Sequence, residues 1–359
     1  MTVRDNVRVK SLVALSLLLV ACAPETDSIS VGTNGVSTTG TSTTSTSTTS
    51  TSTTSTSTTK PVVQPIQVLP AAAAVGETVD RELTTSDGRT RTYHLYIPSA
   101  LPAGAVPLLI ALHGGTGWGT QFQRNSGFDE LAEANGFLVV FPDGLGLGDN
   151  ADQFRTWNGG YCCGTAMKQD VDDVGFINAL IDAIVGEFDV DANRVFAAGH
   201  SNGGIMSYRL ACELSDRIVA IGLQAGSLGI DECAPSQPVS VLHLHGTADQ
   251  NHPIDGGIGS NSISDTNFHS AAYSVETAAT AMGCETRPTS SSDATNPDLA
   301  VTSWVQCAGG VEVRLVAVDG ATHSWMGHVA SNPAASPSYA GLDASVVIVE
   351  FLLNHARLP

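Results

Sequence analysis

The sequence predicts an α/β protein whose mainly parallel central sheet is covered by helices on both faces. From about residue 90 onward, short apolar runs alternate with segments of helical periodicity, which is typical of strand–helix–strand units. Several runs show no polar alternation, as expected for strands that are buried on both faces. Reactive side chains follow three of these runs, so the carboxyl edge of the sheet is the predicted site.

The most specific signal is a serine between glycines, directly after the apolar run at 195–198. The stretch reads Gly-His-Ser-Asn-Gly at 199–203, and a helical segment follows it. Glycines at both ends let a strand and a helix pass close together without a Cβ clash. The serine then sits in a tight turn that projects its hydroxyl into a pocket, which is the nucleophile elbow of the α/β-hydrolase fold. Ser201 is therefore the predicted nucleophile.

An acid and a histidine follow in the chain order Ser…Asp…His that this fold uses. Asp249 lies just after the apolar strand at 239–244. His323 lies in the turn after the strand at 311–318. We expect His323 to be the general base and Asp249 to be the acid that orients it. Asp255 competes for the role of the acid, because it lies six residues further along the same loop.

A third loop supplies the predicted oxyanion hole. The apolar strand at 108–112 leads into a glycine-rich turn, His-Gly-Gly-Thr-Gly at 113–117. Acyl transfer builds negative charge on a carbonyl oxygen, and two fixed backbone N–H groups can stabilise it by about 3 kcal/mol each. We expect one donor at the amide of Asn202 and the other at Gly115 or Thr116.

The remaining elements follow from their apolar periodicity. The other expected strands lie at 92–97, which alternates and is antiparallel, at 137–141 and at 218–223. The expected helices are 128–133, 172–188, the elbow helix up to 214, 269–282 and 342–355. The stretch 144–169 has no clear period, and a loop this long in a compact domain is usually functional.

Residues 1–21 have the three parts of a secretory signal peptide. Basic residues between Val3 and Lys10 precede an apolar run at 12–20 that is too short to span a bilayer. Cys22 follows at a position that resembles the bacterial lipoprotein signal, in which the cysteine becomes N-terminal and is lipidated. We therefore expect export and a lipid anchor at Cys22. The alternative is an ordinary signal peptide that is cleaved near Ala23.

Residues 22–76 form the predicted tether. From 37 to 59 every residue is Ser or Thr except Gly40. Such a segment has no apolar side chains to offset the ordering entropy, so we expect it to be disordered, and its composition allows O-glycosylation. A flexible tether of about 40 residues reaches a few tens of Å. The catalytic domain is expected to fill residues 77–359 as one unit.

The formal net charge is −19 at pH 7. A surface this acidic argues against nucleic acid and anionic lipid as partners. Contact with a membrane, on the outer face of a bacterial cell, is therefore expected only through the lipid anchor. The charge suits an exported protein and does not identify a substrate.

Six cysteines besides Cys22 suggest disulfides in an exported chain. We expect Cys284 to pair with Cys307, because both flank the segment before the last strand. A metal site is the rival interpretation. No Cys-x-x-Cys or helical His-x-x-x-His spacing accompanies these residues, so no metal is expected.

The other four cysteines allow three connectivities. A bond between the adjacent Cys162 and Cys163 would be strained. We therefore expect these two residues to pair with Cys212 and Cys233.

With these motifs assembled, the chain resembles the secreted polyhydroxybutyrate depolymerase-like esterases, a group that also includes feruloyl and acetylxylan esterases. The resemblance runs from about residue 92 to residue 355. It rests on Leu-His-Gly-Gly at 112–115, Trp-Asn-Gly-Gly-Tyr-Cys-Cys at 157–163, Asp-Val-Asp-Asp-Val-Gly-Phe at 170–176, Gly-His-Ser-Asn-Gly-Gly at 199–204, His-Gly-Thr-Ala-Asp at 245–249 and Thr-His-Ser-Trp at 322–325. The resemblance implies the same roles for Ser201, Asp249 and His323.

One position departs from the family pattern, in which proline follows the tryptophan. Here Met326 follows Trp325, which should alter the shape of the pocket and not the triad. Trp157 and Trp325 are candidates for an aromatic wall around an acyl group, and plain packing is the alternative.

The expected reaction is hydrolysis of a carboxylic ester by two acyl transfers through an acyl-enzyme, with no cofactor. The substrate class includes feruloylated or acetylated polysaccharide, polyhydroxyalkanoate oligomers and small esters. Three further hypotheses are an acyltransferase with a sugar hydroxyl as acceptor, a peptidase that uses the same triad, and a non-catalytic surface-binding homologue.

Overall fold

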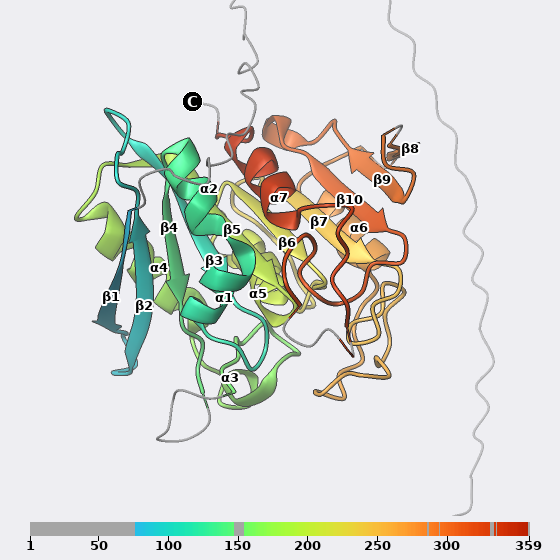
Figure 1. Ribbon diagram of the computed structural model, residues 1–359, viewed down its shortest axis with the longest axis horizontal. Helices are drawn as coiled ribbons and strands as arrows, with labels where there is room; N and C mark the ends of the chain where they lie inside the picture. The colour runs from blue at the N-terminus through green and yellow to red at the C-terminus, as the bar shows by residue number, and fades with distance from the viewer. Residues whose placement is uncertain are drawn as a thin grey trace, which may run out of the picture. The chain divides into compact units, whose positions relative to one another are not determined.

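The computed structural model describes residues 76–146, 154–285, 287–293, 295–330, 334 and 336–357. The predicted signal peptide, Cys22 and residues 22–75 of the predicted tether lie outside the described residues. The described part forms three layers, with one sheet between two layers of helices (Figure 1).

The sheet has ten strands in the order β1-β2-β4-β3-β5-β6-β7-β10-β9-β8. Its middle is parallel, from β4 to β10, and antiparallel strands extend it at both ends. The strands are β1 (Glu77–Thr84), β2 (Thr90–Ile97), β3 (Val106–Leu112), β4 (Leu138–Pro142), β5 (Val190–His200), β6 (Ala220–Gln224), β7 (Ser240–Gly246), β8 (Thr289–Ser292), β9 (Leu299–Trp304) and β10 (Val313–Val318).

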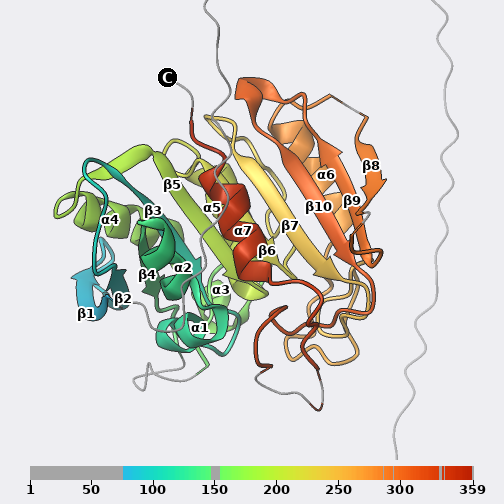
Figure 2. The same cartoon turned by 45° about the horizontal axis from the view of Figure 1, so that its top comes forward.

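The helices divide between the two faces of the sheet (Figure 2). On one face lie α4 (Asp173–Val185), α5 (Asn202–Glu213) and α6 (Ala271–Ala281). On the other face lie α1 (Gly119–Ser126), α2 (Phe128–Asn135) and α7 (Ala344–Leu353). The short α3 (Gly164–Lys168) belongs to the long loop between β4 and α4.

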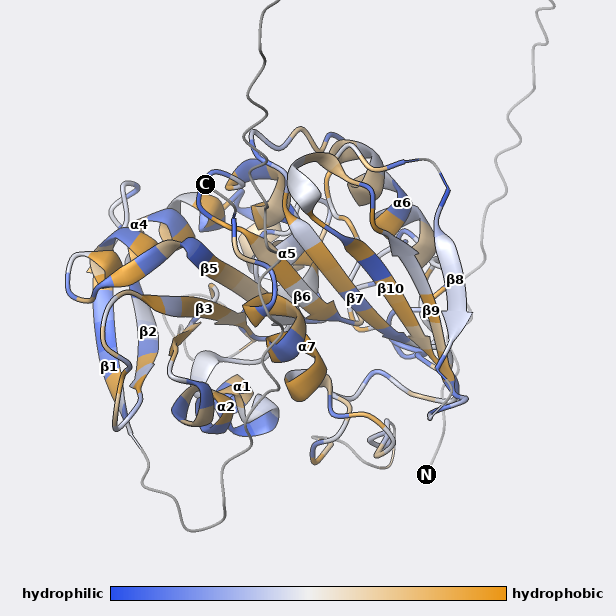
Figure 3. Cartoon of the chain, turned by 90° about the horizontal axis from the view of Figure 1, so that it is seen from above, coloured by the Kyte–Doolittle hydropathy of each residue, from blue (hydrophilic) through white to orange (hydrophobic). Residues whose placement is uncertain are grey.

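The two faces of the sheet carry separate apolar cores, because successive side chains of a strand point to opposite faces. In β7, Val241 packs toward the core of α5 and α6, and Leu242 and Leu244 pack toward the core of α7. The central strands β3, β4, β6 and β7 are buried along their whole length, and Figure 3 shows the apolar character of β3, β6 and β7. The α/β-hydrolase fold predicted from the sequence is therefore confirmed.

Most predicted helices are shorter in the structure, because side-chain caps fix where they begin. The Asp172 carboxylate accepts a hydrogen bond from the amide of Gly175 and begins α4. Ser270 caps α6 in the same way, and Asp343 caps α7. Each cap satisfies an N–H group that would otherwise have no intrahelical partner.

Among the described residues, six elements were not predicted from the sequence: β1, α1, α3, β8, β9 and the short 3-10 helix η1 (Ala308–Gly310). Both β1 and β8 lie at the edges of the sheet, and β8 reads Thr-Ser-Ser-Ser with every side chain exposed. An edge strand with no buried face lacks the apolar signal on which a sequence-based prediction depends. These strands form because a neighbouring strand offers them unpaired backbone groups.

The disulfides differ in part from the expectation. Cys284 pairs with Cys307 as expected. The cross-pairing expected for the other four is wrong, because Cys162 bonds to its neighbour Cys163 and Cys212 bonds to Cys233.

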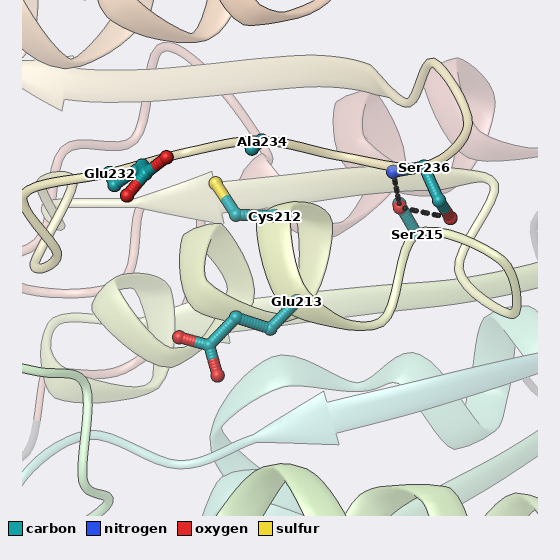
Figure 4. A pocket seen from close by; sticks show the side chains of 6 residues that line it. All are labelled: Cys212, Glu213, Ser215, Glu232, Ala234 and Ser236. Atoms are coloured by element: carbon teal, nitrogen blue, oxygen red, sulfur yellow. Dashed lines mark hydrogen bonds between the residues drawn. The ribbon is translucent and has the colours of Figure 1, made fainter.

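The position of helix α5 explains these pairings. Cys162 packs on Ile205 in the first turns of α5, whereas Cys212 lies near the end of that helix. Seven residues of helix separate Ile205 from Cys212 by about 10 Å, which exceeds the reach of a disulfide. Figure 4 shows Cys212 beside a hollow that Glu213 and Ser236 also line.

Loss of the Cys212–Cys233 bond should weaken the fold and leave catalysis intact. The bond closes a loop of 21 residues, so the double variant Cys212→Ser/Cys233→Ser should lose about 3 kcal/mol of folding free energy. For a domain of this size that lowers Tm by about 5 °C. Calorimetry checks the shift, and an unchanged Tm would contradict a stabilising role for this bond.

Candidate active site

Ser201 lies at the tip of a sharp turn between β5 and α5. Its backbone has φ 54° and ψ −118°, in the left-handed range that residues with a Cβ rarely adopt. The two glycines of the motif make this turn possible. A Cβ on Gly199 would lie 2.2 Å from the carbonyl oxygen of Gly203, and one on Gly203 would lie 2.2 Å from that of Leu112. The elbow therefore brings β5, α5 and β3 together at one point.

Three side chains from separate strand ends meet at this turn. The His323 Nε2 atom lies 3.0 Å from the Ser201 Oγ atom. On the other side of the imidazole, the Nδ1 atom lies 2.7 Å from Oδ2 of Asp249. Because parallel strands end at the same edge of the sheet, the turns after β5, β7 and β10 converge there.

The carboxylate of Asp249 is buried and fully engaged. Its Oδ1 atom accepts hydrogen bonds from the amides of Asn251 (2.8 Å) and His252 (2.9 Å). Burial alone would raise the pKa of Asp249, but the His323 imidazole, the nearby His245 and the hydrogen bond from the His252 amide lower it below its ordinary value. The group is therefore ionised at neutral pH and can orient an imidazolium. His323 contacts Asp249, and not the competing Asp255.

Two residues that the sequence analysis did not assign hold the loop of His323. The His200 Nε2–H group donates to the carbonyl oxygen of His323 at 2.7 Å. Gln224, the last residue of β6, donates to the carbonyl oxygen of Ser324 and accepts from the amide of Met326. Burial lowers the pKa of His200 to about 3, so its neutral ring is a dependable donor. Both residues are polar and lie at the carboxyl end of a central strand, and this position is the sequence signal that could have identified them.

The glycine-rich turn after β3 lies against the elbow. A Cβ on Gly114 would lie 3.5 Å from the Cβ of Ser201, and one on Gly115 would lie 3.6 Å from that of Asn202. The amide of Thr116, which was the alternative to Gly115 as the second expected oxyanion donor, donates to the carbonyl oxygen of Arg155 at 2.8 Å. Because this hydrogen bond occupies the Thr116 amide, Gly115 is the remaining candidate donor in this turn.

Asn202 lies in the first turn of α5, where backbone N–H groups have no intrahelical partner. Its side chain forms a reciprocal pair with the backbone of Trp157. The Trp157 amide donates to Asn202 Oδ1 at 2.7 Å, and Asn202 Nδ2 donates to the Trp157 carbonyl oxygen at 3.0 Å. This pair ties the start of the elbow helix to the long loop between β4 and α4.

The expectation that Trp157 forms a wall of the pocket is wrong. Trp157 is fully buried beneath the turn, and its indole N–H donates to the carbonyl oxygen of His113. Its ring packs between His113 and Phe176. Trp325 does line the cavity, although most of its ring packs on Phe122.

A cavity of about 820 Å³ opens above Ser201. Its lining includes apolar side chains, neutral hydroxyl and amide side chains, and the charged residues Lys168 and Asp265. The apolar residues include Phe122, Met167, Ile205, Phe268, Trp325 and Val329. The neutral polar residues include Gln121, Asn125, Asn251, Asn261, Ser262 and Thr266. Such a cavity can hold a substrate that has both an apolar and a polyhydroxylated part.

Within the described ranges, no group of three or more His, Cys, Asp or Glu residues is placed to hold a metal ion. No helix in the described part of the chain is both long and apolar enough to cross a membrane. The predicted independence from cofactors stays a prediction.

Comparison with known proteins identifies relatives for most of the catalytic unit. A model of the family described as "Esterase PHB depolymerase" matches residues 91–267. "Putative esterase NocK" from Nocardia uniformis subsp. tsuyamanensis is 33% identical over 282 residues, which cover 73% of this chain and 78% of that protein. "Feruloyl esterase B" from Piromyces equi is 31% identical over 227 residues, which cover 61% of this chain and 40% of that protein.

One solved structure, "Acetyl xylan esterase from Aspergillus awamori", aligns with a TM-score of 0.48 at 14% identity. The alignment covers 68% of this chain and 94% of that one. The region matched by the family model includes Ser201 and Asp249, and His323 lies beyond it.

The fold and the site define the class of this protein, which is a serine esterase of the α/β-hydrolase fold. Within that class, the chain belongs to the PHB depolymerase-type esterase family. It spans 78% of the length of NocK and 40% of the length of Feruloyl esterase B.

Proposed function

We propose that this protein is an exported hydrolase of carboxylic esters in which Ser201 is the nucleophile, His323 the general base and Asp249 the orienting acid. The observation that carries the proposal is the continuous hydrogen-bonded line from Ser201 Oγ through the His323 imidazole to Asp249 Oδ2. A serine hydroxyl is a weak nucleophile by itself, and an adjacent oriented base activates it.

The reaction proceeds in two acyl transfers. His323 Nε2 accepts the hydroxyl proton while Ser201 Oγ attacks the ester carbonyl carbon. The C–O bond to the alcohol breaks as His323 returns the proton to the leaving oxygen, which gives the acyl-enzyme. His323 then takes a proton from a water molecule that attacks the acyl-enzyme, and the carboxylic acid product leaves as the Ser201 hydroxyl is restored. The ionised Asp249 stabilises the imidazolium that forms in each half of the reaction.

The oxyanion hole consists of the backbone amides of Asn202 and Gly115. Two observations support these two donors: the first turn of α5 begins at Asn202, and the turn at Gly115 lies against it. Each fixed donor contributes about 3 kcal/mol of transition-state stabilisation. The Asn202–Trp157 pair keeps the helix start rigid, so the donor does not have to be ordered during the reaction.

The substrates are esters derived from polymers, with feruloylated or acetylated polysaccharide and hydroxybutyrate oligomers as the candidates. Support comes from the family of the chain, from its feruloyl esterase relative and from a cavity with both apolar and polar walls. An acyltransferase is the nearest alternative, because the polar side chains of the lining would also suit a sugar hydroxyl as acceptor. A peptidase would use the same triad, and a non-catalytic binding homologue would keep the triad without turnover.

Export and membrane attachment rest on the sequence of the N-terminal residues. The signal-like segment 1–21, Cys22 as the lipidation site and the Ser/Thr-rich tether would hold the esterase outside a bacterial membrane. The acidic composition supports the absence of nucleic acid partners.

Labelling with a fluorophosphonate tests the proposal directly. The purified protein should form one covalent adduct at Ser201, which peptide mass spectrometry locates. It should also hydrolyse p-nitrophenyl acetate. Among methyl ferulate, an acetylated xylo-oligosaccharide and a hydroxybutyrate trimer, at least one should be cleaved in water. A protein that forms no adduct and cleaves no ester would refute the proposed function.

A further inference from the structure

A chain of buried hydrogen bonds runs behind the active site through residues that touch none of the reacting atoms. His243 and His245 lie two residues apart on β7, so their side chains share the face of the sheet that packs on α5. The Tyr208 hydroxyl of α5 lies 3.0 Å from His243 Nδ1. His243 Nε2 lies 2.9 Å from His245 Nδ1. His245 Nε2 lies 2.8 Å from the carbonyl oxygen of His252.

Only one arrangement of protons satisfies this chain. A backbone carbonyl can only accept, so the Nε2 atom of His245 must carry the proton. Its Nδ1 atom is then an acceptor, which requires His243 to donate from Nε2. His243 Nδ1 in turn accepts from the Tyr208 hydroxyl. Each group therefore fixes the tautomer of the next one, in a single direction from α5 to the acid loop.

The chain works only while both imidazoles are neutral. Both rings are fully buried, and burial lowers the pKa of His243 and of His245. The repulsion between the two rings lowers the pKa of His243 further. The charged or titratable groups facing His245 are Asp249, Asp255, His252 and His323, besides His243. A second proton on His245 would place two donors face to face between the rings, and one on His243 would make the Tyr208 hydroxyl the acceptor and reverse that hydrogen bond.

The chain ends on the residue that holds the acid. The carbonyl oxygen of His252 receives the last hydrogen bond, and the amide of His252 donates to Asp249 Oδ1. The other oxygen of this carboxylate contacts His323 Nδ1. The loop from Asp249 to His252 is thus hydrogen-bonded to β7 through the same residue, His252, that donates to the carboxylate.

We propose that Tyr208, His243 and His245 are positioning residues that hold the loop of Asp249, and through it the His323 imidazole, at the reacting distance from Ser201. This inference rests on the proposed function of the triad. Tyr208 is seven residues from Ser201 along α5, which is about 10 Å, so it acts through its partners and not on substrate.

Steady-state kinetics of the purified full chain test the inference. Tyr208→Phe removes the first donor and should lower kcat about tenfold, with KM within about twofold, because a small displacement of a catalytic group affects the chemical step. His245→Met replaces the ring by a side chain of similar length that makes neither hydrogen bond, and it should lower kcat about a hundredfold. His245→Gln keeps an acceptor and a donor about as far apart as the ring nitrogens, and it should restore most of the loss.

Tyr96→Phe is the matched control. Tyr96 is also a buried tyrosine whose hydroxyl is engaged, here with Glu133 and the amide of Gly76, and it lies on β2 away from the chain. Its kcat should equal that of the wild type even if its Tm falls.

The results separate this inference from the proposed function. Unchanged kcat in both Tyr208→Phe and His245→Met, or an equal loss in Tyr96→Phe, would overturn the positioning role while leaving an active triad. Failure of His245→Gln to restore turnover, in a variant that is folded by circular dichroism, would also overturn it. A wild-type protein that neither hydrolyses an ester nor reacts with a fluorophosphonate would instead refute the function.

Discussion

Replacing Ser201 by alanine is expected to lower kcat/KM for p-nitrophenyl acetate by roughly five to six orders of magnitude. The variant has no Oγ atom to form the acyl-enzyme, so His323 has no hydroxyl to activate. His323→Ala should cost a similar amount. Because the two residues act as one unit, the double variant should be only slightly slower than either single variant. Hydrolysis rates, together with circular dichroism to verify the fold, measure these effects.

Ser207→Ala is the control for this experiment. Ser207 lies on the same helix, and its buried hydroxyl donates to the carbonyl oxygen of Gly203. It is not among the residues that line the cavity, so turnover should stay within a few-fold of wild type. Substantial hydrolysis by folded Ser201→Ala, or an equally large loss in Ser207→Ala, would show that the nucleophile is another group.

The second large effect is a steep loss of stability in acid. Burial lowers the pKa of five histidines, to about 4 for His113 and about 3 for His200, and in the same direction for His243, His245 and His252. The folded state keeps these rings neutral, whereas the unfolded chain protonates them below about pH 6.5. The contribution of these rings to the free energy of unfolding is therefore fully present above about pH 7. It is lost as the pH falls from 6.5 toward the folded pKa of each ring.

Each such histidine costs about 1.4 kcal/mol of folding free energy per pH unit over that window. His113 and His200 alone remove about 4 kcal/mol between pH 6.5 and pH 5, and the other three histidines act in the same direction. We expect Tm to fall by at least about 7 °C over this interval. Scanning calorimetry in buffers of matched ionic strength measures the shift.

His245→Gln provides an internal comparison, because it removes one titrating ring and keeps hydrogen-bonding atoms. Its Tm should depend less steeply on pH than that of the wild type, because unfolding then takes up about one proton fewer. A wild-type Tm that differs by only a few degrees between pH 7 and pH 5 would contradict the assignment of neutral buried rings.

Much of the fold could be predicted because its signals are local. The buried runs at β3 and β4 and the glycines around Ser201 act within a few residues, and the structure has these elements close to the predicted positions. Helix ends were less well predicted, since Ser270 and Asp343 fix where their helices begin through side-chain caps of only one or two hydrogen bonds. The edge strands β1 and β8 carry little apolar signal.

The sequence predicts which side chains form the candidate triad, but it does not predict how the surrounding residues are placed. Trp157 reads as a binding aromatic, yet the loop between β4 and α4 folds it under the turn at His113. Thr116 is equivalent to Gly115 in sequence terms, and only the carbonyl of Arg155 distinguishes them. The role of His200 in holding the His323 loop joins segments more than a hundred residues apart, which no local pattern contains.

By itself, the sequence determined the parallel sheet, the elbow at Ser201 and the order of the three reactive side chains, because period, glycine spacing and strand ends are encoded locally. Only the tertiary structure decided which cysteines pair, that the Arg155 carbonyl occupies the Thr116 amide and which histidines form the buried chain on β7. Those outcomes depend on which distant segments come within a few Å of each other, and that proximity is set by packing of the whole sheet against its helices.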